Sequence, residues 1–510
     1  MPLEVELKLS ITAEHATALP RAAPLKAASV GRASTAHLYS IYYDTPKFDL
    51  RDNGVALRLR RAGKRWVQTV KSGGRVDAGL HQREEIETPL AAQIINYRVL
   101  AESGLADILS EPQLPLQLAP VFVTDFKRTT RILEPAAGTR IELCLDRGTV
   151  SAGAASTPIS EVELELKAGS QTHLIDFALA LIEHIPMRLE SVSKAERGYA
   201  LAAGAAPAAV KAGALELSEQ MSVTDALRTI VFGCIAHLQA NERGLLEDDD
   251  IEYVHQARVA VRRLRSAFSI FRPAFPLPLF AEQLEELRWL ADVLGQARDW
   301  DVLLSETLPA MSAALPGEAS LNELMERCID LRSAARTAAR MAVAARRYTA
   351  LLLELTGVFL RAPWSVGADD SAPERKRPLI EFAGAVLNER HRKVMKQSGQ
   401  LDQLDATQLH RLRIRIKKLR YAAEFFATLY ARKAVRDYVR ALSGLQELLG
   451  TLNDAATADR IARALREDGK PDQLEGLGLL RGWSAARAQT SRKQLAKAWS
   501  KFEECEVFWE

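Results

Sequence analysis

The pattern of hydrophobic and polar positions divides the 510-residue chain into two parts with different periodicity. Over residues 1 to about 200, apolar and charged residues alternate between glycine-containing breaks, and this period of two predicts β-strands. Helical interruptions are predicted near residues 12–20, 91–110 and 171–184. From about residue 218 onward, Leu and Ala recur at helical spacing and strand patterns disappear. The sequence therefore predicts an α+β multidomain protein.

The two parts are predicted to be separate domains. A stretch of small residues at 203–217 is interpreted as a linker between a strand domain at 1–202 and an all-α domain at 218–505. Proline and glycine separate the helical stretches of the second part, some of which exceed twenty residues, and this arrangement predicts helix bundles. The separating segments are Pro273–Pro278, Pro309–Gly317, Pro363–Pro378 and Gly469–Pro471.

Charged residues of both signs occupy one face of successive predicted strands. Glu4, Glu6 and Lys8 alternate with apolar residues in the first strand. In any single strand, such a face is usually the solvent-exposed side of an antiparallel sheet. Because the pattern recurs in strand after strand, we interpret these faces as the lining of a closed, hydrated interior. The further positions are Arg58, Arg60, Thr69, Lys71, Arg83, Glu85, Glu87, Arg140, Glu142, Asp146, Glu161, Glu163 and Glu165.

An interior of mixed charge predicts a site for a metal-bound chain of phosphates. Glu4 and Glu6 rise from the same face of a strand, roughly 7 Å apart, which suits a divalent ion. Oxygen ligands favour Mg²⁺ or Mn²⁺ over softer metals. Lys8 is either a substrate ligand or an ion-pair partner of these two glutamates. Further metal ligands are Glu163 and Glu165, with Glu161 as an option, and the candidate phosphate ligands are Arg58, Arg60, Lys71, Arg83 and Arg128.

Residues 1–202 also contain a set of short motifs: Glu4-x-Glu6-x-Lys8, Tyr43-Asp44-Thr45, Leu57-Arg58-Leu59-Arg60, Thr69-x-Lys71, Gly79-Leu80-His81-Gln82-Arg83, Thr124-Asp125-Phe126-x-Arg128, Ile141-Glu142 and Ser193-Lys194-Ala195-x-Arg197-Gly198-Tyr199. This combination resembles the CYTH family, the triphosphate tunnel metalloenzymes. The resemblance implies an eight-stranded antiparallel β tunnel, or barrel, that binds a triphosphate. It also implies that Glu4 and Glu6 are the metal-binding pair.

The same resemblance implies roles for the other tunnel residues. The implied phosphate ligands are Arg58, Arg60, Lys71, Arg128 and Lys194. The implied acidic residues for metal or water are Glu85, Asp146, Glu163 and Glu165. Together with the pattern of charges, this gives Glu4, Glu6, Lys8 and Glu85 as the expected catalytic residues.

The helical part contains an internal repeat at an offset of 155 residues. The segment from His255 to Arg265 aligns with the segment from His410 to Arg420. At the same offset, Leu290, Leu294, Gly295 and Asp299 align with Leu445, Leu449, Gly450 and Asp454. We interpret the helical part as two related bundles, at about 218–365 and 376–505, packed with approximate two-fold symmetry.

Each copy of the repeat carries a stripe of basic residues. Positions i, i+3, i+7 and i+10 fall within an arc of roughly 80° on one helical face. Four cations on one face repel each other unless an anion lies along them, although a solvated face or partners such as Asp299 and Asp454 would also explain the stripe. A linear phosphate polymer needs only cations in a row. The candidate polyphosphate ligands are His255, Arg258, Arg262, Arg265, His410, Arg413, Lys417 and Arg420.

Two further expectations follow from the stripes. They lack interleaved aromatic residues for base stacking, and no helix-turn-helix signature is present, so no specific nucleic-acid partner is expected. Histidine gains charge below about pH 6.5, so affinity for a polyanion should strengthen with mild acidification.

The repeat segments, with Arg298-Asp299-Trp300-Asp301 and Leu448-Leu449-Gly450-x-Leu452-Asn453-Asp454, resemble the CHAD domain. The resemblance spans about residues 218–505 and implies an α-helical module that often follows CYTH domains and binds inorganic polyphosphate. The second copy has Asn453 at the position of Arg298.

Together, the two resemblances imply an inorganic triphosphatase. The expected reaction is metal-dependent hydrolysis of inorganic tripolyphosphate to pyrophosphate and phosphate, with the helical domain binding long-chain polyphosphate or polyphosphate granules. One alternative is thiamine triphosphatase or adenylate cyclase activity in the same tunnel. The other is a non-catalytic protein that binds polyphosphate granules.

Composition adds the expected location. The net charge of +3 gives no bulk attraction to membranes or nucleic acid. The four cysteines are far apart in sequence, which suits a reducing compartment. No run approaches the roughly 20 apolar residues of a membrane helix, so no membrane partner is expected. The expected location is the cytoplasm, including polyphosphate granules.

Overall fold

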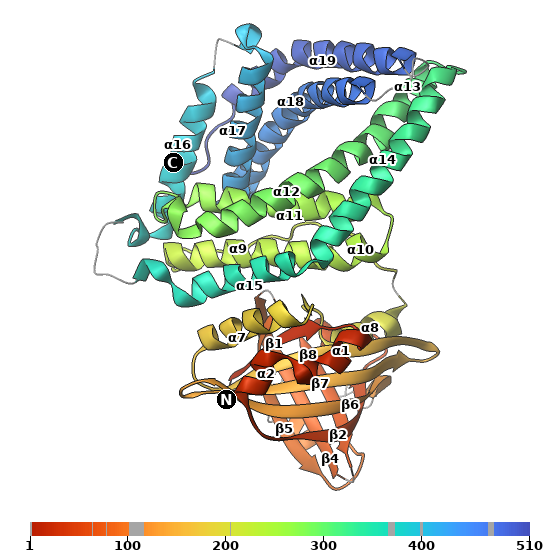
Figure 1. Cartoon of the computed structure of the whole chain (residues 1–510). Helices are drawn as coiled ribbons and strands as arrows, with labels where there is room; N and C mark the ends of the chain where they lie inside the picture. Colours follow the sequence, from red (N-terminus) through yellow and green to blue (C-terminus); the bar gives the residue numbers. More distant parts are fainter. Residues whose placement is uncertain are drawn as a thin grey trace. The chain divides into compact units, whose positions relative to one another are not determined.

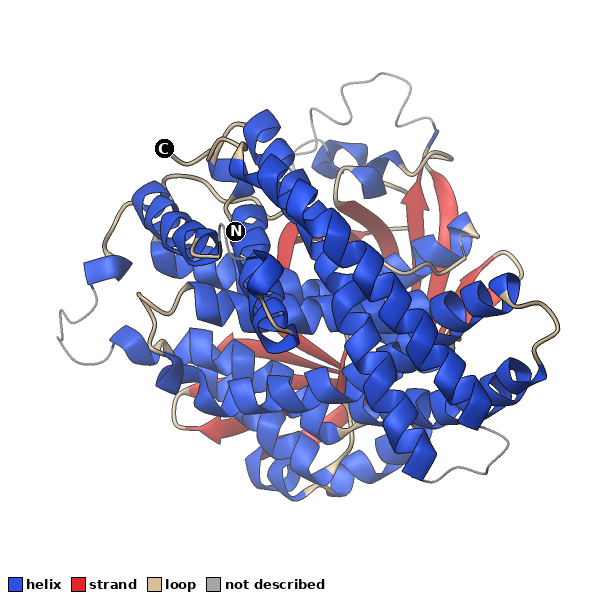
Figure 2. Cartoon of the chain, turned by 90° about the horizontal axis from the view of Figure 1, so that it is seen from above, coloured by secondary structure: helices blue, strands red, loops and turns tan. Residues whose placement is uncertain are grey.

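A computed structural model of the chain describes residues 3–63, 65–77, 79–100, 117–204, 206–365, 373–397, 401–467 and 474–510. The chain forms two compact units, Met1–Ala208 with Ala344–Ala362 and Ala209–Val343 with Pro363–Glu510 (Figure 1). The first unit contains a curled β-sheet and the second is helical (Figure 2). This confirms the predicted fold class. The predicted domains are continuous in sequence, whereas residues 344–362 pack with the first unit.

In the described part of the first unit, nine strands form one antiparallel sheet in the order β5-β4-β3-β2-β6-β7-β8-β1-β9. Strand β5 also pairs with β1, so eight strands close into a ring and the short β9 extends from β1. The predicted eight-stranded tunnel is confirmed. The strands are β1 Leu3–Ser10, β2 Ser29–Asp44, β3 Val55–Ala62, β4 Arg65–Asp77, β5 Leu80–Leu90, β6 Ala119–Ala136, β7 Thr139–Ala152, β8 Ala155–Ala168 and β9 Arg188–Leu189.

Helices accompany the sheet. The predicted helix at 171–184 is α7, which buries Leu174, Phe177 and Leu181 on its apolar face. Of the predicted helical segment 91–110, residues 101–110 lie outside the described residues. The helices of this unit are α1 Ala13–Ala18, η1 Leu19–Arg21, α2 Ala23–Ala28, α3 Asp49–Asp52, α4 Tyr97–Leu100, α7 Gln171–His184, α8 Lys194–Ala203 and α15 Arg346–Arg361.

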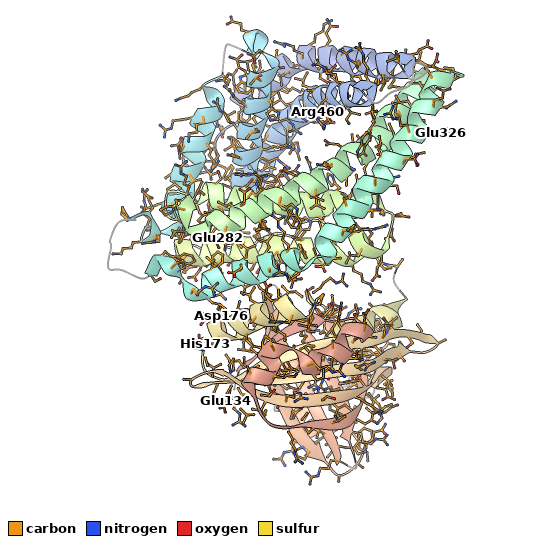
Figure 3. The ribbon with its side chains drawn as sticks, in the orientation of Figure 1. Glu134, His173, Asp176, Glu282, Glu326 and Arg460 are labelled. Carbon is orange, nitrogen blue, oxygen red and sulfur yellow. The ribbon has the colours of Figure 1, made fainter. Side chains whose placement is uncertain are left out.

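Helix α15 comes from the helical half of the sequence but packs on α7. The Thr349 hydroxyl donates a hydrogen bond to the carbonyl of Met187 (3.0 Å), and Arg361 forms an ion pair with Asp176 (2.8 Å; Asp176 is labelled in Figure 3). Met187 immediately precedes β9, which pairs with β1. Helix α15 therefore belongs to the unit that contains the tunnel.

The Tyr43-Asp44-Thr45 motif has a structural role. The fully buried Asp44 carboxylate accepts hydrogen bonds from the backbone amides of Thr45, Leu50 and Arg51 at 2.7–3.0 Å. It also accepts one from the Tyr199 hydroxyl at 2.9 Å. This carboxylate therefore joins the end of β2 to α3 and to α8.

The second unit repeats one order of helices. Helices α11 and α17 each contain 20 residues, and their N-cap residues, Asp250 and Asp405, are 155 positions apart, as are their C-cap residues, Phe271 and Phe426. At the same offset, α9 corresponds to α16, the start of α14 corresponds to the start of α19, and α12, η4 and α13 together correspond to the single helix α18. The first copy contains α9 Val223–Ala240, α10 Glu242–Glu247, α11 Ile251–Ile270, η3 Leu277–Phe280, α12 Ala281–Val302, η4 Leu303–Thr307, α13 Leu308–Ala314 and α14 Ala319–Ala344. Then follow η5 Pro363–Ser365, η6 Pro373–Arg375, α16 Leu379–Met395, η7 Leu401–Gln403, α17 Ala406–Phe425, η8 Ala427–Leu429, α18 Arg432–Glu467 and α19 Leu474–Glu503.

The predicted linker is held at two points of the helical unit. The amide of Val210 donates to the Asn241 side chain (2.9 Å), and the amide of Leu217 donates to the Thr428 hydroxyl (3.0 Å).

The four cysteines are free thiols. Across the described residues, none of the helices has the length and apolar character needed to cross a membrane.

Candidate active site and cationic cluster

Strand β1 has both of its faces buried. Leu7 and Leu9 on one face are fully buried, whereas Glu6 and Lys8 on the other face line a cavity inside the ring of strands. The side chains of Glu6 and Lys8 are only 8% and 9% exposed. The alternating charges of this strand therefore point into the tunnel and not into bulk solvent.

The cavity has a volume of about 280 Å³, and its described lining contains seven acidic and seven basic side chains. An interior of equal opposite charge holds a polyanion only if cations enter with it or if carboxylates give up their basic partners. The predicted residues that line it are Glu4, Glu6, Lys8, Arg58, Arg60, Lys71, Glu85, Arg128, Glu163, Glu165 and Lys194. Asp146 lies outside this lining, and the side chain of Arg83 is outside the described residues.

Two carboxylates share one lysine at the first part of the site. Lys71 Nζ lies 2.9 Å from Glu4 and 3.0 Å from Glu85, and Arg58 also contacts Glu85 at 3.1 Å. Burial raises the pKa of Glu4 to about 7. The positive charge of Lys71 acts against this shift, and the negative charges of Glu6 and Glu85 add to it. Although burial acts against it, the charges of Arg58 and Lys71 lower the pKa of Glu85 to about 2. Glu85 is thus ionised, whereas the positive charge near Glu4 is too small to offset its burial and its acidic neighbours.

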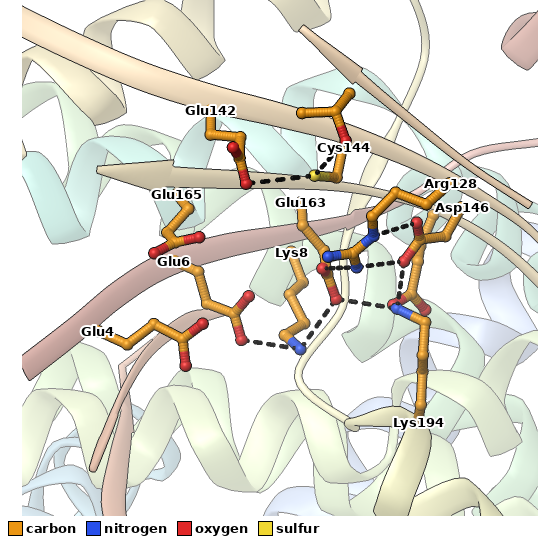
Figure 4. A network of polar contacts seen from close by, with 12 residues as sticks. Glu4, Glu6, Lys8, Arg128, Glu142, Cys144, Asp146, Glu163, Glu165 and Lys194 are labelled. Atoms are coloured by element: carbon orange, nitrogen blue, oxygen red, sulfur yellow. Dashed lines mark hydrogen bonds and ion pairs between the residues drawn. The ribbon is translucent and has the colours of Figure 1, made fainter. Parts of the chain in front are cut away.

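Glu163 is the centre of a second group, shown in Figure 4. Its carboxylate contacts Lys8 (3.2 Å), Lys194 (2.9 Å) and Arg128. Burial alone would raise the pKa of Glu163, but these three cations hold it well below its usual value. Lys8 also contacts Glu6 of its own strand (2.9 Å), and its contact with Glu163 connects β1 to β8.

Behind Glu163, two more carboxylates also contact Lys194. Asp146 is fully buried and contacts Arg128 (2.6 Å) and Lys194 (2.7 Å), while Glu161 contacts Lys194 and Arg197. Oxygen atoms of Asp146, Glu161 and Glu163 lie within 4.8 Å of one another. Among the described residues, these three carboxylates are the set that lies close enough together to hold a metal ion. The predicted ligands Glu4, Glu6 and Glu165 do not form such a set.

The charge balance distinguishes the two candidate metal positions. Asp146, Glu161 and Glu163 together contact four cations, so their charge is already compensated; these cations are Lys8, Arg128, Lys194 and Arg197. Glu4 takes up a proton near pH 7 because Glu6 and Glu85 crowd it in a buried site. A divalent cation beside Glu4 and Glu6 would replace that proton, and carboxylate oxygens are suitable ligands for Mg²⁺ or Mn²⁺. The donor set of β1 therefore fits the predicted metal.

Arg60 differs from the other tunnel cations. Its Nε donates to the Ser40 hydroxyl at 3.3 Å, and within the described part of the chain it forms no ion pair. Burial, followed by the neighbouring charges of Arg58 and Arg128, lowers its pKa to about 10. The guanidinium groups of Arg58, Arg60 and Arg128 thus lie close to one another, and among the described residues Arg60 has no carboxylate as an ion-pair partner. This is the local geometry of an anion site.

Several lining residues are absent from the sequence-based candidates. Tyr42 stacks on Phe122 (ring centroids 4.4 Å apart), and its hydroxyl lies 3.4 Å from Arg58, its register partner on β3. Strand parity with Ser40 could have identified Tyr42. Cys144 and Lys167 in the lining were also missed. Glu87 and Glu142 were predicted to face the interior but were given no specific role, and Arg197 contacts Glu161 behind the lining.

In the helical unit, four of the predicted stripe residues form one cluster across α11 and α17, here called the cationic cluster: Arg258, Arg262, Arg413 and Lys417. Arg262 reaches across to donate to the Tyr421 hydroxyl (2.7 Å). Burial, and then the charges of Arg262, Arg413 and Arg258, lower the pKa of Lys417 to about 6. The acidic side chains near the cluster are Asp299 and Asp454, and Asp299 also pairs with Arg460 at 3.0 Å (Arg460 is labelled in Figure 3).

The other stripe residues have different surroundings. Arg420 pairs with Glu424 (3.0 Å) and Gln446 (2.9 Å), and His410 bonds to Asn453 (2.9 Å). Burial and the nearby Arg298 lower the pKa of His255 to about 4. The expectation that His255 gains charge below pH 6.5 is therefore wrong, because burial and neighbouring cations oppose its protonation.

Two family models match the chain. The CYTH domain model matches residues 2–199, and the CHAD domain model matches residues 229–463. Among solved structures, the CHAD domain from the plant Ricinus communis is 33% identical, with a TM-score of 0.51. That match covers 59% of this chain and 98% of the plant chain.

Curated proteins match in two ways. An inorganic triphosphatase of Haemophilus influenzae is 35% identical over 199 residues, which cover 39% of this chain and 54% of that protein. The chain thus aligns with about half the length of this relative. An uncharacterized protein of Mycobacterium tuberculosis is 27% identical over 529 aligned residues, covering 98% of this chain and 96% of that protein.

Proposed function

The chain belongs to the CYTH and CHAD families, with one domain of each in tandem, and we propose that it is a metal-dependent inorganic triphosphatase whose helical domain binds polyphosphate. The CYTH domain and its similarity to the triphosphatase of Haemophilus influenzae support triphosphatase-type activity. The finer proposal is that the substrate is inorganic tripolyphosphate, which is hydrolysed to pyrophosphate and phosphate.

The observation that carries this proposal is the convergence of Arg58, Arg60 and Arg128 inside the tunnel, with Arg60 outside any described ion pair. Guanidinium groups bind phosphate oxygens in a bidentate manner. A chain of phosphates entering the tunnel would compete with Glu85 for Arg58 and with Glu163 for Arg128. Phosphate groups would thus replace carboxylates as partners of the tunnel cations.

Different residues of the tunnel would have different roles in phosphoryl transfer. Arg58, Arg60 and Arg128 would neutralise the phosphate oxygens and hold the chain in line for attack. Glu85, kept ionised by Arg58 and Lys71, would orient the attacking water. Mg²⁺ or Mn²⁺ held by Glu4 and Glu6 would supply further neutralisation of the phosphoryl oxygens.

The described lining favours an inorganic substrate. It contains one aromatic side chain, Tyr42, whose ring is already stacked on Phe122. A nucleobase or thiazole ring would therefore find no free aromatic surface among these residues. Phosphate groups need only the cations that the tunnel provides.

The test is phosphate release from tripolyphosphate, ATP and thiamine triphosphate, each with Mg²⁺, Mn²⁺ or a chelator. We expect hydrolysis of tripolyphosphate that depends on the metal and exceeds that of the organic triphosphates. Preference for thiamine triphosphate, or formation of cyclic AMP, would assign one of the alternative activities. A flat signal with every substrate and metal would leave a polyphosphate-binding role alone.

The binding role of the helical domain is tested separately. Arg258, Arg262, Arg413 and Lys417 come from both repeats and leave a surplus of positive charge over Asp299 and Asp454. We expect changing all four cations to Ala to abolish the binding of long-chain polyphosphate to the full chain. Binding that survives these changes would refute the proposed role of the cationic cluster. Association with polyphosphate granules depends on the same cluster, so the same variant should not co-sediment with granules.

A further inference from the structure

The two repeats differ in charge at one position of the contact between α11 and α17, which is Glu424 in one repeat and Ser269 in the other. In one half of the contact, the carboxylate of Glu424 accepts from Arg263 of the facing helix (3.2 Å) and from Arg420 of its own helix (3.0 Å). Arg263 also lies over the Phe425 ring, 5.0 Å from its centroid. A single glutamate thus neutralises two arginines, one from each repeat.

The repeat offset identifies the equivalent residues in the other half. Subtracting 155 positions places Ser269 where Glu424 stands, while Lys418 and Arg265 correspond to Arg263 and Arg420. In the described structure, neither Lys418 nor Arg265 forms an ion pair. The cations are therefore present in both halves of the contact, but the carboxylate is present in only one.

Helix α16 brings further positive charge to this half. Helices α16 and α17 run side by side (Figure 1), and Arg390 donates to the backbone carbonyl of Ser269 at 2.8 Å. Lys393 is ion-paired with Glu389 of its own helix, and the charge of Glu389 also acts on Arg390. Burial, followed by the charges of Arg390, Arg265 and Lys393, lowers the pKa of Lys418. The charged groups that act on Lys418 are thus cations.

We propose that Arg265, Lys418 and Arg390 form a second anion site, which takes a phosphate-class anion in the place that Glu424 occupies in the other repeat. The geometry across the contact supplies the template: one anionic group between a cation of α11 and a cation of α17. The site does not use the four residues of the cationic cluster and does not rest on the proposed hydrolysis. The anion is either free pyrophosphate or a segment of a polyphosphate chain.

Lys418 provides a site-resolved test in the full chain. Acylation of lysines is measured by mass spectrometry in the presence of inorganic phosphate, pyrophosphate or long-chain polyphosphate. We expect pyrophosphate to reduce Lys418 labelling at least fivefold, in a saturable manner, while the exposed Lys433 is unaffected. Protection by long-chain polyphosphate alone would identify a polymer segment as the anion. Unchanged labelling with all three anions would overturn the proposal.

Ser269→Glu restores the missing carboxylate and should compete with the anion. We expect this variant to weaken anion protection of Lys418 at least tenfold, whereas Thr337→Glu, with the same charge change on the exposed face of α14, should not. If Ser269→Glu does not fold, Arg265→Gln should still weaken protection. Protection that survives both Ser269→Glu and Arg265→Gln would refute the site.

Two further measurements separate this site from the others. Protection by pyrophosphate should persist when the four residues of the cationic cluster are changed to Ala, and its loss there would show that the site is not independent. Tripolyphosphate hydrolysis is measured on the same samples. If the wild-type chain lacks hydrolysis, the proposed function fails while the labelling result still decides the second anion site.

Discussion

The tunnel and the cationic cluster both gather basic side chains, but they compensate the charge differently. In the tunnel, carboxylates outweigh burial and raise the pKa of Lys8 and Lys194 above the usual lysine value. In the cationic cluster, burial and neighbouring arginines lower the pKa of Lys417 to about 6. The tunnel is therefore charge-balanced within the fold, whereas the cluster has a surplus of positive charge.

This difference indicates two modes of anion binding. An anion in the tunnel must displace carboxylates from their cations, and those carboxylates then need a new cation, which a divalent metal can provide. An anion at the cluster displaces nothing and relieves repulsion between like charges. The tunnel should thus depend on metal, and the cluster should depend on pH and ionic strength.

The largest effect on hydrolysis is expected when the proposed metal ligands are removed from the tunnel. We expect Glu4→Gln with Glu6→Gln to lower tripolyphosphate hydrolysis by about 10²–10³-fold, because the proposed metal loses its two ligands on β1. Lys8 and Lys71 keep Glu163 and Glu85 as partners, so the fold should persist. Initial rates with Mg²⁺ and Mn²⁺ measure the effect.

The control for that variant is Glu87→Gln, which removes a half-exposed carboxylate from the same lining. It should retain hydrolysis within about threefold of wild type. Polyphosphate binding by the helical unit should be unchanged in both variants. Hydrolysis within tenfold of wild type in the Glu4 and Glu6 variant would contradict the assignment of the metal to β1.

A smaller effect distinguishes an unpaired tunnel cation from a paired one. Arg60→Gln should raise the KM for tripolyphosphate by about 10–100-fold, which is roughly 1.4–2.8 kcal/mol, without lowering the melting temperature. Arg58→Gln should raise the KM and also lower the melting temperature, because it leaves Glu85 and Tyr42 without their guanidinium partner. Equal melting temperatures of the two variants would count against this distinction.

Much of the tunnel could be predicted from its sequence because a strand alternates strictly. Once the ring closes, the parity of Glu4, Arg58 and Glu163 determines which side chains point inward. The same rule could have identified Tyr42, which was missed because an aromatic residue in a strand normally packs in a core. Asp146 has inward parity as well, but Arg128 and Lys194 hold it behind the lining.

The helical unit was harder to predict because a helix face does not specify its neighbour. The repeat offset indicated the order of helices and made Arg262 and Lys417 equivalent, but it did not predict that α11 and α17 face each other. Spacing alone could not reveal that Glu424 captures Arg420, or that burial suppresses the protonation of His255. Likewise, no local pattern marks α15 as part of the unit that contains the tunnel. These features depend on tertiary contacts.

The surplus charge of the cluster should cost stability. The folded pKa of Lys417, about 6, lies below its usual value of 10.5, so folding opposes protonation of this lysine. The penalty is fully present below about pH 6 and disappears as the pH rises toward 10.5. Lys417→Met should therefore stabilise the chain by about 1–2 kcal/mol near pH 6, after allowance for its partial exposure, and by almost nothing near pH 10.

Chemical denaturation at pH 6, 8 and 10 measures this gain, with the exposed Lys433→Met as the matched control. The control should change stability by no more than about 0.5 kcal/mol at each pH. Lys417→Met should at the same time weaken polyphosphate binding, because it removes one of four clustered cations. If Lys417→Met instead destabilises the chain at pH 6, the positive charge of Lys417 must already be compensated by other groups in the fold.

The smallest expected effect is the pH dependence of binding. A polyanion favours the charged form of Lys417, so polyphosphate affinity should rise about threefold to tenfold between pH 8 and pH 6 at constant ionic strength. Lys417→Arg keeps the charge at every pH and should remove this dependence. His255→Gln should retain it, because the pKa of His255 is lowered to about 4. Titrations at both pH values measure the slope, and a slope that disappears in His255→Gln but persists in Lys417→Arg would assign the proton to the histidine instead.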